Sequence, residues 1–247
     1  MPIQYSGRCP VCEQDTMFEM RTPKFYRSAQ CASCGSWPAQ RAFWFAMTSL
    51  RPNWRDLAIH ESSAGGDPVT SRFLKECRNY IISQYDPDRP GGMMVFDPDK
   101  AGGKYIVQDL QKQTFPDGYF DLVVTREVFE HVFDPAAAIS EIVRTLKPGG
   151  LCLMAVPVAN RFKPTQRRAR ITDGVLEHIL PPEYHGNPMS QDGALVTIDW
   201  GYDIAPLLTK FSGIHFYSQT FDNRELGIKD EFNQIVIGIK GELPDIT

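Results

Sequence analysis

The sequence predicts an α/β protein whose main domain is a doubly wound, seven-stranded sheet, preceded by a small zinc ribbon. Two observations lead to this prediction. From residue 56 onward, short apolar runs of strand length alternate with amphipathic segments of helix length. Before residue 40, four cysteines form two C-x-x-C pairs, a spacing typical of metal ligands. We therefore expect a zinc ribbon at 1–40, a helical connector at 41–55 and the main domain at 56–247.

In the first region, Cys9 and Cys12 form one pair and Cys31 and Cys34 form the other, with 18 residues between the pairs. A two-residue spacer lets both thiolates of a tight turn face one tetrahedral ion, with Zn–S bonds of about 2.3 Å. The intervening residues favour the short strands of a hairpin. Four thiolates close the coordination shell, so the pattern predicts a structural zinc ion rather than a catalytic one.

The second region, 41–55, favours a helix that packs the ribbon on the main domain, because its apolar residues recur at helical spacing and Pro52 ends the pattern. Base stacking by its aromatic residues is the less favoured alternative. The periodic residues are Ala42, Phe43, Phe45, Ala46 and Leu50.

The main domain then alternates strands with helices, as a doubly wound sheet requires. The run at 120–125 is almost entirely apolar, as expected of a buried parallel strand. The predicted strands are 56–61, 80–85, 105–110, 120–125, 151–156, 214–219 and 234–239. The predicted helices are 69–80, a segment containing Ile139, Ile142, Val143 and Leu146, and 205–211.

Three consecutive motifs are similar to class I S-adenosylmethionine-dependent methyltransferases of the type 11-like group. They are F-P-D-G-Y-F-D-L-V-V-T at 115–125, E-V-F-E-H-V-F-D-P at 127–135 and E-I-V-R-T-L-K-P-G-G-L at 141–151. The resemblance covers 56–157 by motif and extends to 240 by layout. It implies a Rossmann-like methyltransferase sheet, S-adenosylmethionine as the cofactor and methyl transfer as the activity.

The loop after the first strand is where the resemblance places the methionine end of the cofactor. Small residues there let backbone amides approach a ligand closely. The family pattern is acid-x-Gly-x-Gly-x-Gly, whereas this chain has Ser63 and Asp67 at the flanking glycine positions and keeps only the middle glycine. The implied cofactor-binding residues are Glu61, Ser62, Ser63, Ala64, Gly65, Gln84, Tyr85, Asp109, Leu110 and Arg126.

Residues 158–203 interrupt the alternation for about 45 residues, which is too long for an ordinary connection. We expect this segment to form a cap over the acceptor. Five of the eleven residues at 160–170 are basic, which favours an anionic acceptor. The candidate catalytic residues are His131, which follows the fourth strand, and Tyr184 and His185 in the cap.

The sequence thus predicts a methyltransferase for a small-molecule or glycan-type acceptor. A first alternative is an RNA methyltransferase that uses the ribbon and the basic loop; its footprint would include Arg8, Arg21, Lys24 and Arg27. The net charge of −4 makes nucleic acid the less favoured partner. A second alternative is a non-catalytic binding or scaffold protein with the same fold, motivated by the altered glycine loop.

Length and composition are those of a globular protein: 247 residues, of which 42% are hydrophobic and 23% charged. No run approaches the roughly 18 apolar residues of a membrane span. The first residues also lack the basic-then-apolar layout of a secretory signal. We therefore expect a cytoplasmic protein, and we make no prediction about its oligomeric state.

Overall fold

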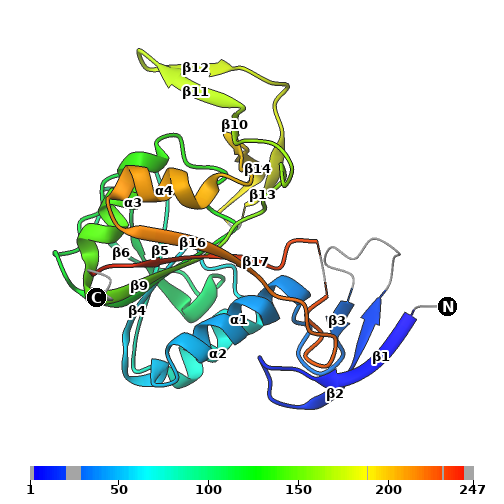
Figure 1. Cartoon of the computed structure of the whole chain (residues 1–247). Coiled ribbons are helices and arrows are strands. Elements are labelled where there is room, and N and C mark those ends of the chain that lie inside the picture. Colours follow the sequence, from blue (N-terminus) through cyan, green and yellow to red (C-terminus); the bar gives the residue numbers. More distant parts are fainter. Residues whose placement is uncertain (1–2, 21–28, 188, 230, 242–247) are drawn as a thin grey trace, which may run out of the picture.

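The computed structural model describes residues 3–20, 29–187, 189–229 and 231–241 (Figure 1). Its centre is an eight-stranded mixed sheet with the strand order β16-β17-β9-β8-β4-β5-β7-β6. The helices α1 and α2 lie on one side of this sheet, and α3 and α4 lie on the other (Figure 1). The predicted α/β, doubly wound, Rossmann-like architecture is therefore confirmed.

Parallel pairing joins the five inner strands, and antiparallel pairing joins the strands at both edges. The parallel strands are β4 (Ala58–Ser62), β5 (Asn79–Gln84), β7 (Lys104–Val107), β8 (Phe120–Arg126) and β9 (Leu146–Ala155). The antiparallel strands are β6 (Met94–Phe96), β16 (His215–Thr220) and β17 (Gln234–Ile239).

The prediction of seven strands was wrong by one, because β6 adds an antiparallel edge strand beside β7. This strand has three residues, Met94–Phe96, and lies between Gly91-Gly92 and Asp97-Pro98. So short a run shows no measurable period-2 pattern, which is why the sequence did not reveal it.

The helices in the described part of the chain are α1 (Pro38–Leu50), α2 (Pro68–Glu76), α3 (Pro135–Thr145) and α4 (Ile204–Ser212). The helix predicted to reach Tyr80 ends at Glu76, and Tyr80 belongs to β5. Short 3-10 turns occur at Trp54–Asp56 and Ala101–Gly103. Within the described residues, no helix combines the length and the apolar character needed to cross a membrane.

Alternate residues of β8 separate the two hydrophobic layers. Val123 packs with α3 and α4 residues such as Ile139 and Leu208. Leu122 and Val124 pack on the opposite face, in the cluster that contains α1 and α2 residues. This alternation is the expected consequence of a strand whose side chains point to opposite faces, both covered by helices.

The N-terminal region is a three-stranded antiparallel sheet of β1 (Ile3–Arg8), β2 (Asp15–Met20) and β3 (Ala29–Cys31). It packs directly on the main domain through α1, which begins at Pro38, inside the stretch expected to belong to the ribbon. Fully buried Arg41 of α1 donates from Nη2 to the carbonyl oxygen of Gly227 at 2.7 Å. The helix thus belongs to the layer that covers the sheet and also fixes the ribbon.

The 158–203 segment adds no strand to the central sheet, consistent with the prediction that it is not another layer of it. It forms small antiparallel pairs, and the β11–β12 hairpin projects away from the body while β13–β14 lies closer to it (Figure 1). The pairs are β10 (Gln166–Arg167) with β15 (Ile198–Asp199), β11 (Ala169–Thr172) with β12 (Val175–His178), and β13 (Tyr184–Asn187) with β14 (Ser190–Leu195).

Candidate functional site

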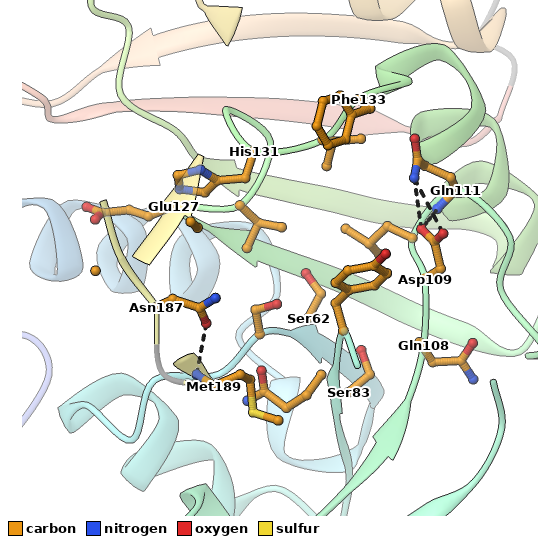
Figure 2. Close-up of a pocket in the computed structure, with 18 residues that line it drawn as sticks. Ser62, Ser83, Gln108, Asp109, Gln111, Glu127, His131, Phe133, Asn187 and Met189 are labelled. Carbon is orange, nitrogen blue, oxygen red and sulfur yellow. Dashed lines mark hydrogen bonds between the residues drawn. The ribbon is translucent and has the colours of Figure 1, made fainter. Parts of the chain in front are cut away.

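A cavity of about 220 Å³ lies where the carboxyl ends of the parallel strands meet (Figure 2). This edge is the usual ligand-binding position of an open α/β sheet. The cavity brings together residues that follow β4, β5, β7 and β8, together with residues of the β13–β14 hairpin. Seven predicted site residues line it: Ser62, Ser63, Gln84, Tyr85, Asp109, Leu110 and His131.

A second cavity, of about 230 Å³, continues from the first, since Ser63, Glu127 and Gly186 line both. It contains three further predicted residues, Glu61, Gly65 and Arg126, and also Trp37, Gln40 and Asp67. The two cavities therefore adjoin each other along the sheet edge. Of the predicted cofactor-binding residues, Ala64 lines neither cavity and is buried.

The loop after β4 has the geometry that the missing glycines would have been expected to provide. Ser63 adopts a left-handed φ of 54°, a conformation that normally favours glycine. Its backbone N–H donates to the carbonyl oxygen of Ser83 at 2.8 Å, and Gln84 Nε2 donates to the carbonyl oxygen of Ala64 at 3.0 Å. A Cβ on Gly65 would meet open space, so this glycine leaves room in the cavity.

Asp67, the second departure from the glycine pattern, has three kinds of structural contact, one of which is a hydrogen bond that Gln40 Nε2 donates to its Oδ2 at 2.9 Å. Its Oδ1 caps α2 by accepting from the backbone N–H groups of Val69 and Thr70 at 2.9 and 3.0 Å. Its Oδ2 accepts from Arg126, which also donates from Nε to Glu61 at 2.8 Å. An aspartate is therefore accommodated at this position because it begins the helix and binds a buried guanidinium.

Burial and ion pairing have opposite effects on the pKa values of Glu61, Asp67 and Arg126. Burial raises the pKa of Glu61, against the opposing effect of Arg126. Burial alone would lower the pKa of Arg126, but the carboxylates of Asp67 and Glu61 raise it. Asp67 likewise is buried, yet Arg126 and its helix-capping hydrogen bonds lower its pKa. Arg126 is thus held in its charged form beside the second cavity.

Asp109, which follows β7 and lines the first cavity, is held in one orientation by Gln111. The Asp109 Oδ1 accepts from the backbone N–H of Gln111 at 2.8 Å and from its Nε2 at 3.2 Å, as Figure 2 shows. Tyr85 borders the same cavity with 55% of its surface exposed, while Leu110 is buried. This end of the cavity offers a carboxylate between an aromatic ring and an apolar side chain.

The opposite end brings His131 and His185 together although they are 54 positions apart in the sequence. Their rings are 5.3 Å apart between centroids, and both face Glu130, which is 2% exposed. His131 lines the cavity, and burial lowers its pKa. His185 lies beside Gly186, which borders both cavities. Tyr184, the third candidate catalytic residue, is 56% exposed and lines neither cavity.

The basic run of the cap segment is occupied by internal contacts. Arg167 Nη1 donates to the carbonyl oxygen of Phe133 at 2.7 Å, Arg168 pairs with Asp199 at 2.8 Å, and Arg170 pairs with Glu177 at 2.7 Å. These three arginines line neither cavity. The inference of an anionic acceptor from this run therefore has no support in the contacts.

The four cysteines of the ribbon converge as the spacing predicts. Their sulfur atoms all lie within 4.8 Å of one another, with 3.8 Å between Cys9 and Cys34 and 3.9 Å between Cys12 and Cys31. All four are free thiols, which a tetrahedral zinc site requires. Of the basic residues of the RNA alternative, Arg8 pairs with Asp15, and Arg21, Lys24 and Arg27 lie outside the described residues.

Sequence reasoning missed eleven of the eighteen residues that line the first cavity. Those next to predicted residues could have been found from the motifs themselves, because they follow β7 and β8 directly. Those on the β13–β14 hairpin gave no local signal beyond the long interruption of the β/α pattern. The missed residues are Ser83, Gln108, Gln111, Glu127, Val128, Val132, Phe133, Gly186, Asn187, Met189 and Ala194.

Comparison with protein families places a methyltransferase model on the same part of the chain. Residues 69–154 match the family described as "Methyltransferase domain". They include β5, β7, β8 and most of β9, which form much of the cavity. Residues 69–154 are thus similar to a methyltransferase domain.

Curated relatives agree with this match over short stretches. The chain is 33% identical to tocopherol O-methyltransferase of Arabidopsis thaliana over 82 residues, or 33% of this chain and 24% of that protein. It is 40% identical to 2-methyl-6-phytyl-1,4-hydroquinone methyltransferase of Synechocystis over 52 residues, or 21% of this chain and 16% of that protein. The matched part is thus less than half the length of these relatives. The Arabidopsis protein is described as chloroplastic, so a cytoplasmic location stays a prediction.

Solved structures with low sequence identity share the fold. DesVI of Streptomyces venezuelae gives a TM-score of 0.52 at 11% identity, covering 82% of this chain and 92% of that one. YcgJ of Bacillus subtilis gives a TM-score of 0.50 at 11% identity, covering 82% and 99%. At such identities the likeness shows the fold alone.

Proposed function

We propose that the chain is an S-adenosylmethionine-dependent methyltransferase that acts on a small-molecule acceptor. One observation carries the proposal: residues from the ends of four strands line the first cavity, and most of these strands lie in the stretch that matches a methyltransferase domain. Fold alone does not specify the reaction, whereas this convergence of residues is a property of the site.

The residues present fit the cofactor, because two of the described residues that line the first cavity carry buried polar atoms with unused hydrogen-bonding capacity. Among the described residues, the buried atoms Gln84 Oε1 and Ser62 Oγ have no hydrogen-bond partner. A buried polar atom of this kind is costly unless a ligand satisfies it. In the proposed arrangement Asp109 and Leu110 bind adenine, Gln84 and Tyr85 contact the nucleoside, and the loop with Glu61 and Arg126 holds the methionine end.

Bound S-adenosylmethionine supplies an electrophilic methyl group on a sulfonium. The contribution of this chain is then positioning, since transfer is an in-line displacement that depends on orientation. The acceptor-side wall is formed by His131, Val132, Phe133 and Ala194, and is largely apolar. The names of two relatives specify tocopherol and hydroquinone acceptors, which favours a small aromatic alcohol over a glycan.

The same proposal assigns a structural role to zinc in the N-terminal region. The four convergent thiols support a closed tetrahedral site, and buried ribbon residues such as Val11 and Phe18 share a hydrophobic cluster with α1 and the central sheet. Zinc would therefore stabilise the surface on which α1 packs.

Calorimetric titration of the full chain with S-adenosylmethionine and with its demethylated product tests the proposal. Both should bind, and Asp109→Ala should weaken binding by about 1–3 kcal/mol, or roughly 5- to 150-fold, because a buried donor of adenine loses its acceptor. Asp88→Ala is the matched control, since Asp88 is exposed near the same sheet edge and lines neither cavity. If neither compound binds, the non-catalytic scaffold interpretation holds instead.

A further inference from the structure

We propose that Glu130, His131 and His185 form a binding site for one divalent metal ion at the acceptor end of the cavity. The role of this ion in methyl transfer rests on the proposed function, but binding of the ion does not. The site is distinct from the cysteine cluster, because its ligands are two imidazoles and a carboxylate contributed by β13 and the loop after β8.

The distances suit a single ion. The three ligand atoms lie within 4.8 Å of one another, with 3.7 Å between His131 Nε2 and Glu130 Oε1, and 3.9 Å between His185 Nδ1 and the same oxygen. Metal–ligand bonds of about 2.0–2.2 Å place two ligands of one ion no more than about 4 Å apart. Small side-chain rotations are enough to close the remaining gap. The two rings lie edge to face at 89°, so they do not stack and can converge on one point.

In each of the two histidines, the ring nitrogen that does not face Glu130 lies near an oxygen atom. His131 Nδ1 lies 2.9 Å from the carbonyl oxygen of Leu195, and since a carbonyl only accepts, this nitrogen carries the proton. His185 Nε2 lies 3.4 Å from Glu183 Oε1, which orients the second ring in the same way. The nitrogens that face Glu130 therefore carry lone pairs. Histidines that bind metals in proteins almost always have this arrangement of a carbonyl or carboxylate behind the ring.

The proposed metal site adjoins the first cavity through one of its three ligands. His131 lines the first cavity, and Ala194, which pairs with His185 across the β13–β14 hairpin, lines it as well. Glu130 is 2% exposed, and a cation beside it would offset the cost of burying its carboxylate. The hairpin is thus the element that completes the site, because it carries His185 to the loop that holds Glu130 and His131.

Three protein ligands leave coordination positions open, in contrast to the closed shell of a four-cysteine site. Imidazole and carboxylate ligands suit first-row divalent ions such as zinc, iron, cobalt and manganese. The open position fits a hydroxyl oxygen of the acceptor, whose pKa falls when it binds a cation. The hydroxyl proton passes to water, the oxygen forms a bond to the methyl carbon, and the carbon–sulfur bond breaks with its electron pair remaining on sulfur. The acceptor class is therefore a small molecule with a hydroxyl group.

The test is a titration of the zinc-loaded full chain with Mn²⁺ or Co²⁺, followed by calorimetry and by electron paramagnetic resonance. Thiolate sites favour softer ions than Mn²⁺, so a zinc-filled ribbon does not compete for it. We expect one ion to bind per chain. His185→Ala and Glu130→Gln should each weaken binding more than tenfold, whereas His215→Ala on the edge strand β16 should leave it unchanged.

Circular dichroism and S-adenosylmethionine affinity, measured on the same variants, show whether each has folded. His185 is 38% exposed at its side chain, so its replacement is the safer of the two changes. If wild-type chain binds neither ion, or if His185→Ala binds as tightly as wild type, the metal site is overturned. Cofactor binding without metal binding overturns this inference alone, and metal binding without cofactor binding overturns the proposed function alone.

Discussion

The described residues contain two clusters of side chains of metal-ligand types, and the two differ in how the chain assembles them. The cysteine cluster takes all four ligands from residues 9–34, with two in each tight turn. The Glu130–His131–His185 cluster takes two ligands from one loop and a third from a hairpin 54 positions later. The first is a closed set of identical ligands at the edge of the fold, and the second is an open, mixed set that borders the cavity.

This difference indicates different consequences for the loss of each cluster. Four ligands within a region of three short strands make the metal part of the local folding free energy. Three ligands on elements already held by the sheet and by hairpin pairing make the metal a ligand of a preformed site. Changes at the cysteines should therefore act mainly on stability, and changes at the histidines mainly on binding and turnover.

The largest expected effect is that of Cys31→Ser on the ribbon. The variant should lose one equivalent of zinc and several kcal/mol of unfolding free energy, because structural zinc in small domains binds with about 10–16 kcal/mol. Amide hydrogen exchange should rise in residues 3–20. Cys77→Ser is the control, since Cys77 is a free thiol outside the cluster. Zinc-free wild-type protein, purified without chelator, would contradict this prediction.

The comparison also shows how far sequence reasoning reaches. The spacing of Cys9, Cys12, Cys31 and Cys34 predicted a cluster that the fold brings together, because ligands in tight turns have little freedom. The inner strands were predicted because each contains a short apolar run, and β8 in particular is largely apolar and buried on both faces. The end of α2 was not predicted correctly, because Cys77 and Arg78 carry no helix-stop signal and the apolar pattern continues into β5.

The acceptor side was harder to predict for a physical reason. His131 and His185 meet only because β13–β14 folds back over the loop after β8, and such long-range pairing leaves no periodic pattern in either segment. The arginines of the cap illustrate the opposite case. Their composition suggested an anion site, but Arg168 and Arg170 pair with acidic residues of their own segment. A run of like charges therefore indicates a ligand site only when nearby residues of opposite charge do not pair with it.

An intermediate effect is expected for Glu183→Gln, which changes the residue behind His185 but not a proposed metal ligand. A neutral amide orients the ring less strongly than a carboxylate, and the substitution removes a negative charge near the proposed site. The affinity for Mn²⁺ should therefore fall by about tenfold or more. The unfolding free energy should stay nearly constant, because Glu183 is half exposed. Glu177→Gln on the neighbouring β12 strand is the matched control. Equal metal affinity in both variants would show that Glu183 does not orient His185.

The smallest effect is expected for Ser36→Ala, which changes a residue that contacts the cysteine cluster. Ser36 is fully buried, and its Oγ lies 3.2 Å from Cys34 Sγ, 3.4 Å from Cys9 Sγ and 3.3 Å from Arg41 Nη1. Ser36→Ala should lower the unfolding free energy by about 1 kcal/mol, the usual net cost of lost hydrogen bonds, and should keep the zinc. Exposed Ser33→Ala should change neither quantity. If Ser36→Ala released zinc while the unfolding free energy stayed unchanged, the cysteine site would form before the metal binds, as proposed for the histidine cluster. The contrast between the two clusters would then be wrong.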